Sequence, residues 1–187
     1  MIGCCWNVRS INNKVDDVMA YVTDNEITLT FVSETWLFSQ NNDITEKIKS
    51  YGYKIIHTPR KSETKSLGGG VAIICKAFLN ITKVYIKHGT SFESVCAKLK
   101  LGTGENVICS CLYRTDLLQA TFFAEFDEFI GSLFVKYSRL LICGDLNIHL
   151  DVNSAEVRKF NELISSYGLE QHVSEATHKH GHILDVI

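Results

Sequence analysis

Apolar strands follow one another without helices through the middle of the chain, and this run limits the possible folds more than any other feature. In its longest stretch, Val95, Ala97 and Leu99 share one face, while the residues between them point to the other. Successive strands that lack helical connections pair antiparallel, so this region predicts an antiparallel sheet. The stretches are residues 71–75, 81–86, 92–101 and 107–113.

Helical periodicity appears on both sides of this run. Apolar residues recur every three or four positions over 15–22, over 122–133 after the candidate N-cap Thr121, and over 157–164. We predict an α/β fold of four layers, with two packed, mainly antiparallel sheets and the helices outside, in one domain spanning residues 1–187. The remaining predicted strands are residues 2–8, 28–33, 53–57, 140–143 and 184–187.

Composition excludes several other classes of protein. Seven cysteines without a CxxC pair argue against a disulfide framework or a zinc ribbon, so we expect free core thiols in a reducing compartment. The sequence has no signal-peptide pattern and no apolar run of about 18 residues, so we expect a soluble, intracellular protein without membrane contact. The net charge of −2 means that any contact with nucleic acid would rest on a local basic patch.

Polar residues interrupt the apolar pattern where predicted strands end, and they are candidates for a functional site. They are Asn7, Glu34, Tyr113, Asp145 and Asn147. Strand ends that face one edge can gather side chains from distant parts of a sequence. Each residue alone also fits a simpler explanation: a surface acid, a turn after an apolar strand, or a half-buried aromatic.

The types of these residues suit phosphodiester hydrolysis. A carboxylate such as Glu34 is a hard oxygen ligand for Mg²⁺, and Asp145 can position a water molecule. The expected extended segment after Gly144 would turn Asp145 and Asn147 to one face, and the glycine would allow a close approach. Asn7, Asn147 and Tyr113 can donate hydrogen bonds to phosphate oxygens.

Six sequence blocks in order resemble the endonuclease domains of non-LTR retrotransposons, within the exonuclease–endonuclease–phosphatase superfamily. The resemblance implies a nuclease that nicks target DNA with Mg²⁺, or Mn²⁺ in its place, and leaves a 3′-hydroxyl for target-primed reverse transcription. A nuclear location follows from that substrate. The blocks are 6–14 (WNVRSINNK), 31–37 (FVSETWL), 68–73 (GGGVAI), 112–114 (LYR), 143–149 (CGDLNIH) and 177–185 (THKHGHILD).

The resemblance also implies roles for individual residues. Glu34 matches the metal-binding glutamate, and Asn7 matches the asparagine beside metal and phosphate. Tyr113 corresponds to the tyrosine on the scissile phosphate. Asp145 corresponds to the aspartate that activates water, and Asn147 is its phosphate-binding partner.

Two further matches lie near the end of the sequence. Thr177 matches a threonine near the phosphate, and Asp185 matches the aspartate that orients a catalytic histidine. In the family that histidine belongs to a later Ser-Asp-His block, which the 187 residues do not contain. We therefore expect a truncated domain that lacks the last strand and the reverse transcriptase normally found in the same polypeptide. The alternatives are an inactive remnant that at most binds nucleic acid passively, or a lipid or inositol phosphatase.

Several basic residues are candidates for contact with DNA phosphates. Arg9 and Arg114 adjoin the motifs, and Arg60, Lys61 and Lys65 form the most basic local stretch. That stretch is equally well explained as a solvated loop.

The glycines and histidines admit simpler explanations. Gly68–Gly70 lacks a following Lys-Ser/Thr, so we interpret it as backbone room at a strand start and not as a phosphate loop. His178, His180 and His182 have no cysteine or carboxylate at ligand spacing, so they do not predict zinc. His149 is interpreted as structural or close to DNA.

Overall fold

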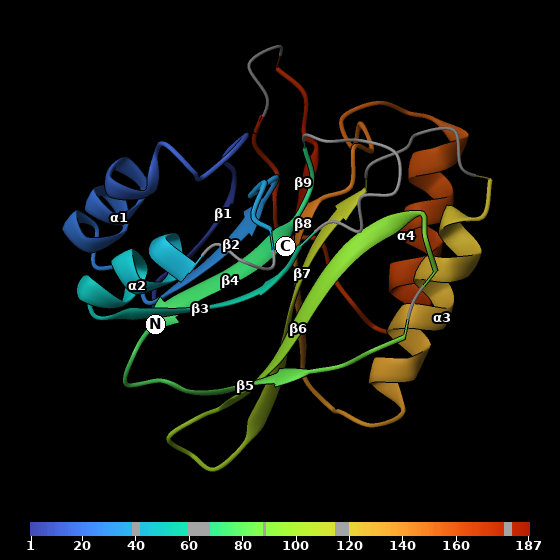
Figure 1. Ribbon diagram of the computed structural model, residues 1–187. Helices are drawn as coiled ribbons and strands as arrows, with labels where there is room; N and C mark the ends of the chain where they lie inside the picture. Colours follow the sequence, from blue (N-terminus) through green and yellow to red (C-terminus); the bar gives the residue numbers. More distant parts are fainter. Residues whose placement is uncertain (39–41, 60–67, 88, 115–119, 178–180) are drawn as a thin grey trace.

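The computed structural model shows four layers, with helix pairs on the outside and two sheets packed together inside (Figure 1). It describes residues 1–38, 42–59, 68–87, 89–114, 120–177 and 181–187. The predicted sandwich is therefore confirmed. The elements are β1 (Gly3–Asn7), α1 (Val15–Asp24), β2 (Leu29–Ser33), α2 (Asn42–Ser50), β3 (Tyr53–Thr58), β4 (Val71–Lys76), β5 (Asn80–Val84), β6 (Phe92–Lys100), β7 (Asn106–Arg114), α3 (Phe122–Phe134), β8 (Leu140–Asp145), α4 (Ala155–Ser166) and β9 (Asp185–Val186).

Each sheet is mainly antiparallel and contains one parallel pair. The first sheet has the order β1-β2-β4-β3, and the second has the order β5-β6-β7-β8-β9. The parallel pairs are β1 with β2 and β7 with β8, and each is joined through a helix, α1 or α3. Parallel neighbours end on the same side, so these two pairs bring the C-terminal ends of four strands to one edge of the sandwich, here called the rim.

Three apolar layers hold the sandwich together. The α1 and α2 side chains pack on the first sheet around Met19 and Ile48, and α3 and α4 pack on the second around Phe126 and Phe160. Between the sheets, the face of β6 that carries Val95, Ala97 and Leu99 packs against β2 and β4, as its alternation predicts.

The seven cysteines are free, and five of them are buried. Burial raises the pKa of Cys75 and of Cys96 to about 11 and that of Cys109 to about 12. These thiols stay protonated and act as small core side chains, as their apolar sequence context predicts.

Three details differ from the sequence-based expectations. The helix α2 was not predicted, although Ile44 and Ile48 are four residues apart, because its other residues are polar. Thr121 precedes α3 but makes no side-chain cap hydrogen bond, whereas Ser154 accepts one from the backbone N–H of Val157 at the start of α4. The last strand is confirmed but short, since β9 contains only two residues.

Candidate active site

Strand register explains how the candidate residues reach the rim. Asn7 ends β1 opposite Ser33, the last residue of β2, so Glu34 follows directly at the same edge. In the other sheet Tyr113 of β7 is opposite Asp145, which ends β8. Because the two sheets pack face to face, their strand ends meet at the rim.

The Asn7 side chain joins the two sheets. Its Nδ2 donates to Glu34 Oε1 at 2.8 Å and to Asp145 Oδ2 at 3.0 Å. Its Oδ1 accepts the backbone N–H of Arg9 at 3.2 Å, which fixes the amide orientation. One neutral donor thus lies between two acidic side chains, a place where charge-assisted hydrogen bonds are strong.

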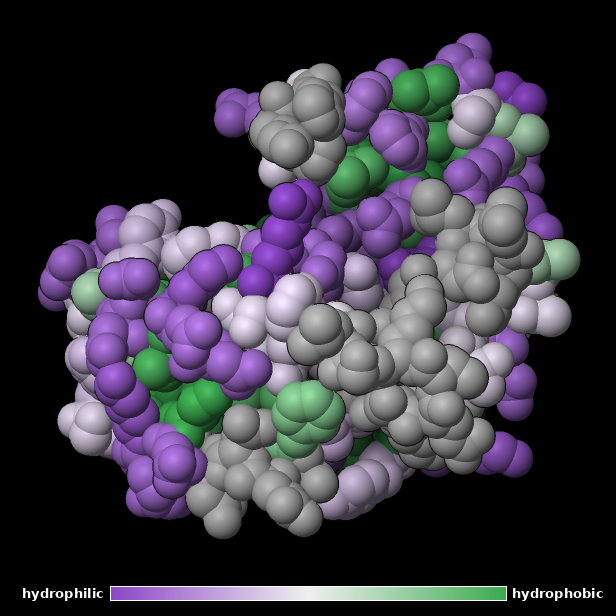
Figure 2. Space-filling model, turned by 45° about the horizontal axis from the view of Figure 1, so that its top comes forward, coloured by the Kyte–Doolittle hydropathy of each residue, from purple (hydrophilic) through white to green (hydrophobic). Residues whose placement is uncertain are grey.

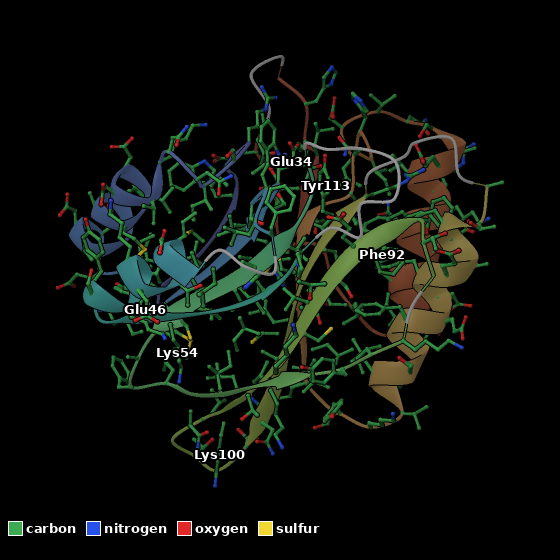
Figure 3. The ribbon with its side chains drawn as sticks, in the orientation of Figure 1. Glu34, Glu46, Lys54, Phe92, Lys100 and Tyr113 are labelled. Atoms are coloured by element: carbon green, nitrogen blue, oxygen red, sulfur yellow. The ribbon has the colours of Figure 1, made fainter. Side chains whose placement is uncertain are left out.

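Tyr113 completes this cluster from the second sheet. In Figure 3, Glu34 and Tyr113 lie at the same end of the sheets, and a hydrogen bond links their side chains. Burial, together with the negative charges of Glu34 and Asp145, raises the pKa of Tyr113 well above its usual value. The phenol therefore remains a neutral hydrogen-bond donor.

Backbone strain is concentrated beside these residues. Glu34 and Trp36 have positive φ angles of 51° and 55°, which side chains other than glycine rarely adopt. Arg9, Ser10 and Asn147, which follow β1 and β8, also have positive φ. Such strain persists only where surrounding contacts hold it, and it is common at functional sites.

Neighbouring backbone holds the Glu34 segment in this conformation. The Glu34 carbonyl accepts the Ser10 N–H at 2.8 Å, while the Thr35 and Trp36 N–H groups donate to Gly70 and Gly69. A Cβ on Gly70 would lie 2.5 Å from the Thr35 hydroxyl oxygen. The glycines before β4 thus give the backbone room that the sequence predicts, and this room serves the segment carrying Glu34.

Asp145 is placed by a tight contact between β7 and β8. A Cβ on Gly144 would lie 1.9 Å from the Leu112 carbonyl oxygen, so only glycine allows this approach. The expected extended segment is wrong at Asn147, which lies beyond β8 with φ of 52°. Its backbone N–H donates to Asp145 Oδ1 at 3.0 Å, and its Nδ2 donates to the Arg114 carbonyl at 2.8 Å.

Asp185 lies next to Asp145, because β9 pairs with β8 at these two residues. Burial raises the pKa of Asp185 to about 6, the negative charge of Asp145 adds to the rise, and a hydrogen bond with Thr177 opposes it. Among the described residues Asp185 Oδ1 has no hydrogen-bond partner. The Thr177 oxygen also accepts the backbone N–H groups of Leu184 and Asp185, so Thr177 holds Asp185 in place.

The basic candidates fall into three groups. Arg9 is exposed beside Asn7. The Arg114 side chain is only 3% exposed, forms an ion pair with Glu156 at 2.8 Å, and stacks over the Phe122 ring at 4.2 Å. That placement does not favour the phosphate contact expected from its position in the sequence. Arg60, Lys61 and Lys65 lie outside the described residues.

Glu93 is a rim residue that the sequence did not reveal. It is opposite Tyr113 across β6 and β7, and its Oε2 accepts the Gly70 N–H at 2.6 Å. Its negative charge also contributes to the raised pKa of Tyr113. The available signal was a lone acidic residue at the start of an otherwise apolar strand.

The rim cluster has the chemistry that a hard divalent cation requires. Glu34 and Asp145 supply carboxylate oxygens, and the Asn7 amide N–H group links the two side chains by hydrogen bonds. Oxygen ligands of this kind suit Mg²⁺ or Mn²⁺. Figure 2, in which the rim comes forward, shows hydrophilic side chains across the middle of this face.

Solved structures with this fold include known endonucleases and phosphatases. The endonuclease domain of TRAS1, a telomere-specific non-LTR retrotransposon, gives a TM-score of 0.72 at 11% identity, with 97% of this chain and 81% of that chain covered. The human Nocturnin catalytic domain gives 0.66 at 12% identity, covering 97% and 79%. The 3′ phosphatase NExo from Neisseria gives 0.61 at 17% identity, covering 86% and 69%.

Sequence comparison then identifies the family. The model of the endonuclease/exonuclease/phosphatase family matches residues 4–173. The chain belongs to this family, whose members hydrolyse phosphate esters as nucleases and phosphatases. A search of curated proteins found no match. In the part of the chain that the structure describes, no helix has the length and apolar character needed to cross a membrane.

Proposed function

We propose that the chain is a divalent-metal-dependent DNA endonuclease whose active site is the rim cluster. The observation that carries this proposal is the Asn7 amide, which lies within 3.0 Å of two carboxylates from different sheets. Glu34 and Asp145, which are 27 and 138 positions from Asn7 in the sequence, meet at this amide. Two acids held together in this way form a ready site for a cation and an anionic substrate.

The residues divide the work according to their surroundings. Glu34 would hold Mg²⁺, and the ion would supply positive charge for the scissile phosphate. The Asn7 amide N–H group would keep the two carboxylates in place. Asp145 would orient the attacking water and accept its proton, because its carboxylate is fixed by Asn7 and by the Asn147 N–H. Tyr113, kept neutral, would donate a hydrogen bond to a phosphate oxygen.

Asp185 would orient an imidazole N–H, as the family resemblance implies. Its buried Oδ1 has no partner among the described residues. An N–H donor at this oxygen would stabilise the carboxylate and lower the raised pKa of Asp185. Exposed Arg9, beside Asn7, would contact a DNA phosphate. Thr177 would act through Asp185.

Nicking of target DNA for reverse transcription is the specific activity that we favour. The motifs at residues 33–37 (SETWL) and 143–149 (CGDLNIH) resemble the motifs of retrotransposon endonucleases, and the TRAS1 domain has the same fold. A reverse transcriptase in the same polypeptide and a nuclear site of action belong to this proposal.

Relaxation of supercoiled plasmid tests the proposal. We expect Mg²⁺ to support conversion to the nicked circle, EDTA to stop it, and a DNA polymerase to extend the nick directly from its 3′-hydroxyl. The 187-residue chain should be assayed both alone and with a family-type Ser-Asp-His segment appended, because a general acid–base group contributes about 10²–10⁴-fold to a rate. Failure of both chains would favour the inactive remnant, and release of phosphate from inositol phosphates instead would favour the phosphatase.

A further inference from the structure

Three side chains outside the rim cluster meet where the segment after β8 passes the segment before β9. His149 and Asp151 belong to the first segment, and His182 belongs to the second. One potential ligand atom from each lies within 4.8 Å of the others. The His182 Nδ1 is 2.9 Å from Asp151 Oδ2, and the two imidazole rings contact edge to face with centroids 4.4 Å apart.

The backbone around these residues is ordered by its own hydrogen bonds. Asp151 Oδ1 accepts the Ile183 N–H at 3.0 Å, and the Leu150 N–H donates to the Ile183 carbonyl at 3.0 Å. The Val152 N–H donates to the His149 carbonyl at 3.0 Å. The two segments are therefore already aligned before any ligand binds, and small side-chain rotations would close the three atoms around an ion.

An ion pair between Asp151 and His182 accounts for only part of this arrangement. It explains the 2.9 Å contact, and the His182 hydrogen bond lowers the pKa of Asp151 to about 2. It gives no role to His149, whose ring lies against His182 without a hydrogen bond between them among the described contacts. Two imidazoles and a carboxylate in contact are the donor set that Zn²⁺ and similar transition metals bind.

We propose that His149, Asp151 and His182 form a transition-metal site, with Zn²⁺ as its natural occupant, that clamps the β9 segment to the segment following β8. This site is separate from the rim cluster. Its nitrogen ligands favour Zn²⁺ over Mg²⁺, whereas the oxygen atoms of the rim favour Mg²⁺. The His182 and Asp151 side chains are 36% and 28% exposed, so an ion could enter and water could complete its coordination.

The clamp would act on the active site through position alone. His182 lies three residues before Asp185, which pairs with Asp145 at the end of β8. Asp151 lies six residues after Asp145 in the other segment. An ion joining these segments would hold the two aspartates in register, although the inference does not depend on the proposed catalytic function.

Calorimetric titration of the metal-stripped chain with Zn²⁺ tests the site. We expect one ion per chain, a higher Tm, and no competition from millimolar Mg²⁺. The decisive variant is His149→Gln, because it leaves the Asp151–His182 pair intact and changes an exposed residue. Loss of a ligand should weaken Zn²⁺ binding at least about tenfold, given that outer partners of metal ligands already contribute about 10–100-fold.

The matched control is His172→Gln, which changes a histidine outside the cluster and should leave Zn²⁺ affinity unchanged. Binding of Co²⁺ to the original chain should also produce visible absorption bands that His149→Gln loses. The proposal is overturned if the original chain shows no saturable Zn²⁺ binding. It is equally overturned if His149→Gln binds Zn²⁺ as tightly as the original chain, because Asp151 and His182 alone, or residues elsewhere on the protein, would then bind the ion.

Discussion

Replacing Asp185 with Asn should make the protein more stable at neutral pH, because the native fold holds this carboxylate in an unfavourable place. The folded-state pKa of Asp185 is about 6, against 3.8 for the free side chain. A folded pKa above the unfolded one means that the protonated form is favoured on folding. The stability that the protonated Asp185 side chain contributes is fully present below pH 3.8 and is lost as the pH rises through about 6.

The size of the effect follows from the difference between the folded-state pKa of about 6 and the ordinary value of 3.8. At about 1.4 kcal/mol per unit, the upper limit is about 3 kcal/mol. Two effects reduce the expected gain for Asp185→Asn to about 1–2 kcal/mol. The side chain is partly exposed, and the amide of Asn would leave a polar atom unpaired at the place of Oδ1, as the carboxylate does. The gain should appear between pH 4 and pH 6 and stay constant above that range.

Urea unfolding at a series of pH values measures this difference. The control is Asp24→Asn at the exposed end of α1, which should change the free energy of unfolding by less than about 0.5 kcal/mol. The Asp185 variant should also lose nicking activity, since strained polar groups at active sites favour function over stability. A variant that is less stable at pH 7, or a difference that does not depend on pH, would refute the reasoning.

Three other predictions concern single residues. Gly144→Ala should lower the free energy of unfolding by about 3 kcal/mol, because it combines overpacking with a positive φ. Its control, Gly104→Ala, has a positive φ but open space and should lower the free energy of unfolding by about 1 kcal/mol; equal losses would contradict the tight β7–β8 contact. Tyr113→Phe should slow nicking by about 10–100-fold without changing the fold, as expected for a hydrogen bond to a charged phosphate, and an unchanged rate would remove the hydroxyl from the site. Arg114→Gln should lower the free energy of unfolding by about 3 kcal/mol, whereas Arg9→Gln should leave stability unchanged and weaken DNA binding with a smaller dependence on salt; the reverse pattern would show that Arg114 is the DNA contact.

Most of the sheet architecture was predictable because period-two alternation and uninterrupted apolar runs mark the strands directly. Val95, Ala97 and Leu99 lie between the sheets for this reason. The helix α2 was missed because its two apolar residues are too few to produce a visible face. Local periodicity therefore identifies strands and helices with a broad apolar face better than a short helix with only two apolar residues.

The polar residues at strand ends were predictable as candidates, but their individual surroundings were not. Arg114 adjoins a motif in sequence, yet Phe122 of α3 and Glu156 of α4 enclose it in the structure. Likewise His182 finds its partners His149 and Asp151 about thirty residues away, which the spacing of neighbouring histidines could not reveal. Such contacts depend on tertiary packing, and a single sequence gives only the spacing along the chain.

The most direct test of the central claim is the nicking rate across a Mg²⁺ titration for the original chain, Glu34→Gln and Asp145→Asn. All three should be measured either with or without the appended Ser-Asp-His segment, in the form that nicks plasmid faster. Both changes preserve shape and remove one negative charge. Glu34→Gln should need more Mg²⁺ and recover partly at high concentrations, because an amide is a poorer ligand for a hard cation. Asp145→Asn should remain slower by about 10²–10⁴-fold at every concentration, because it cannot take the proton from water. Equal and complete recovery of both variants, or an unchanged rate in either one, would contradict the roles assigned to this rim.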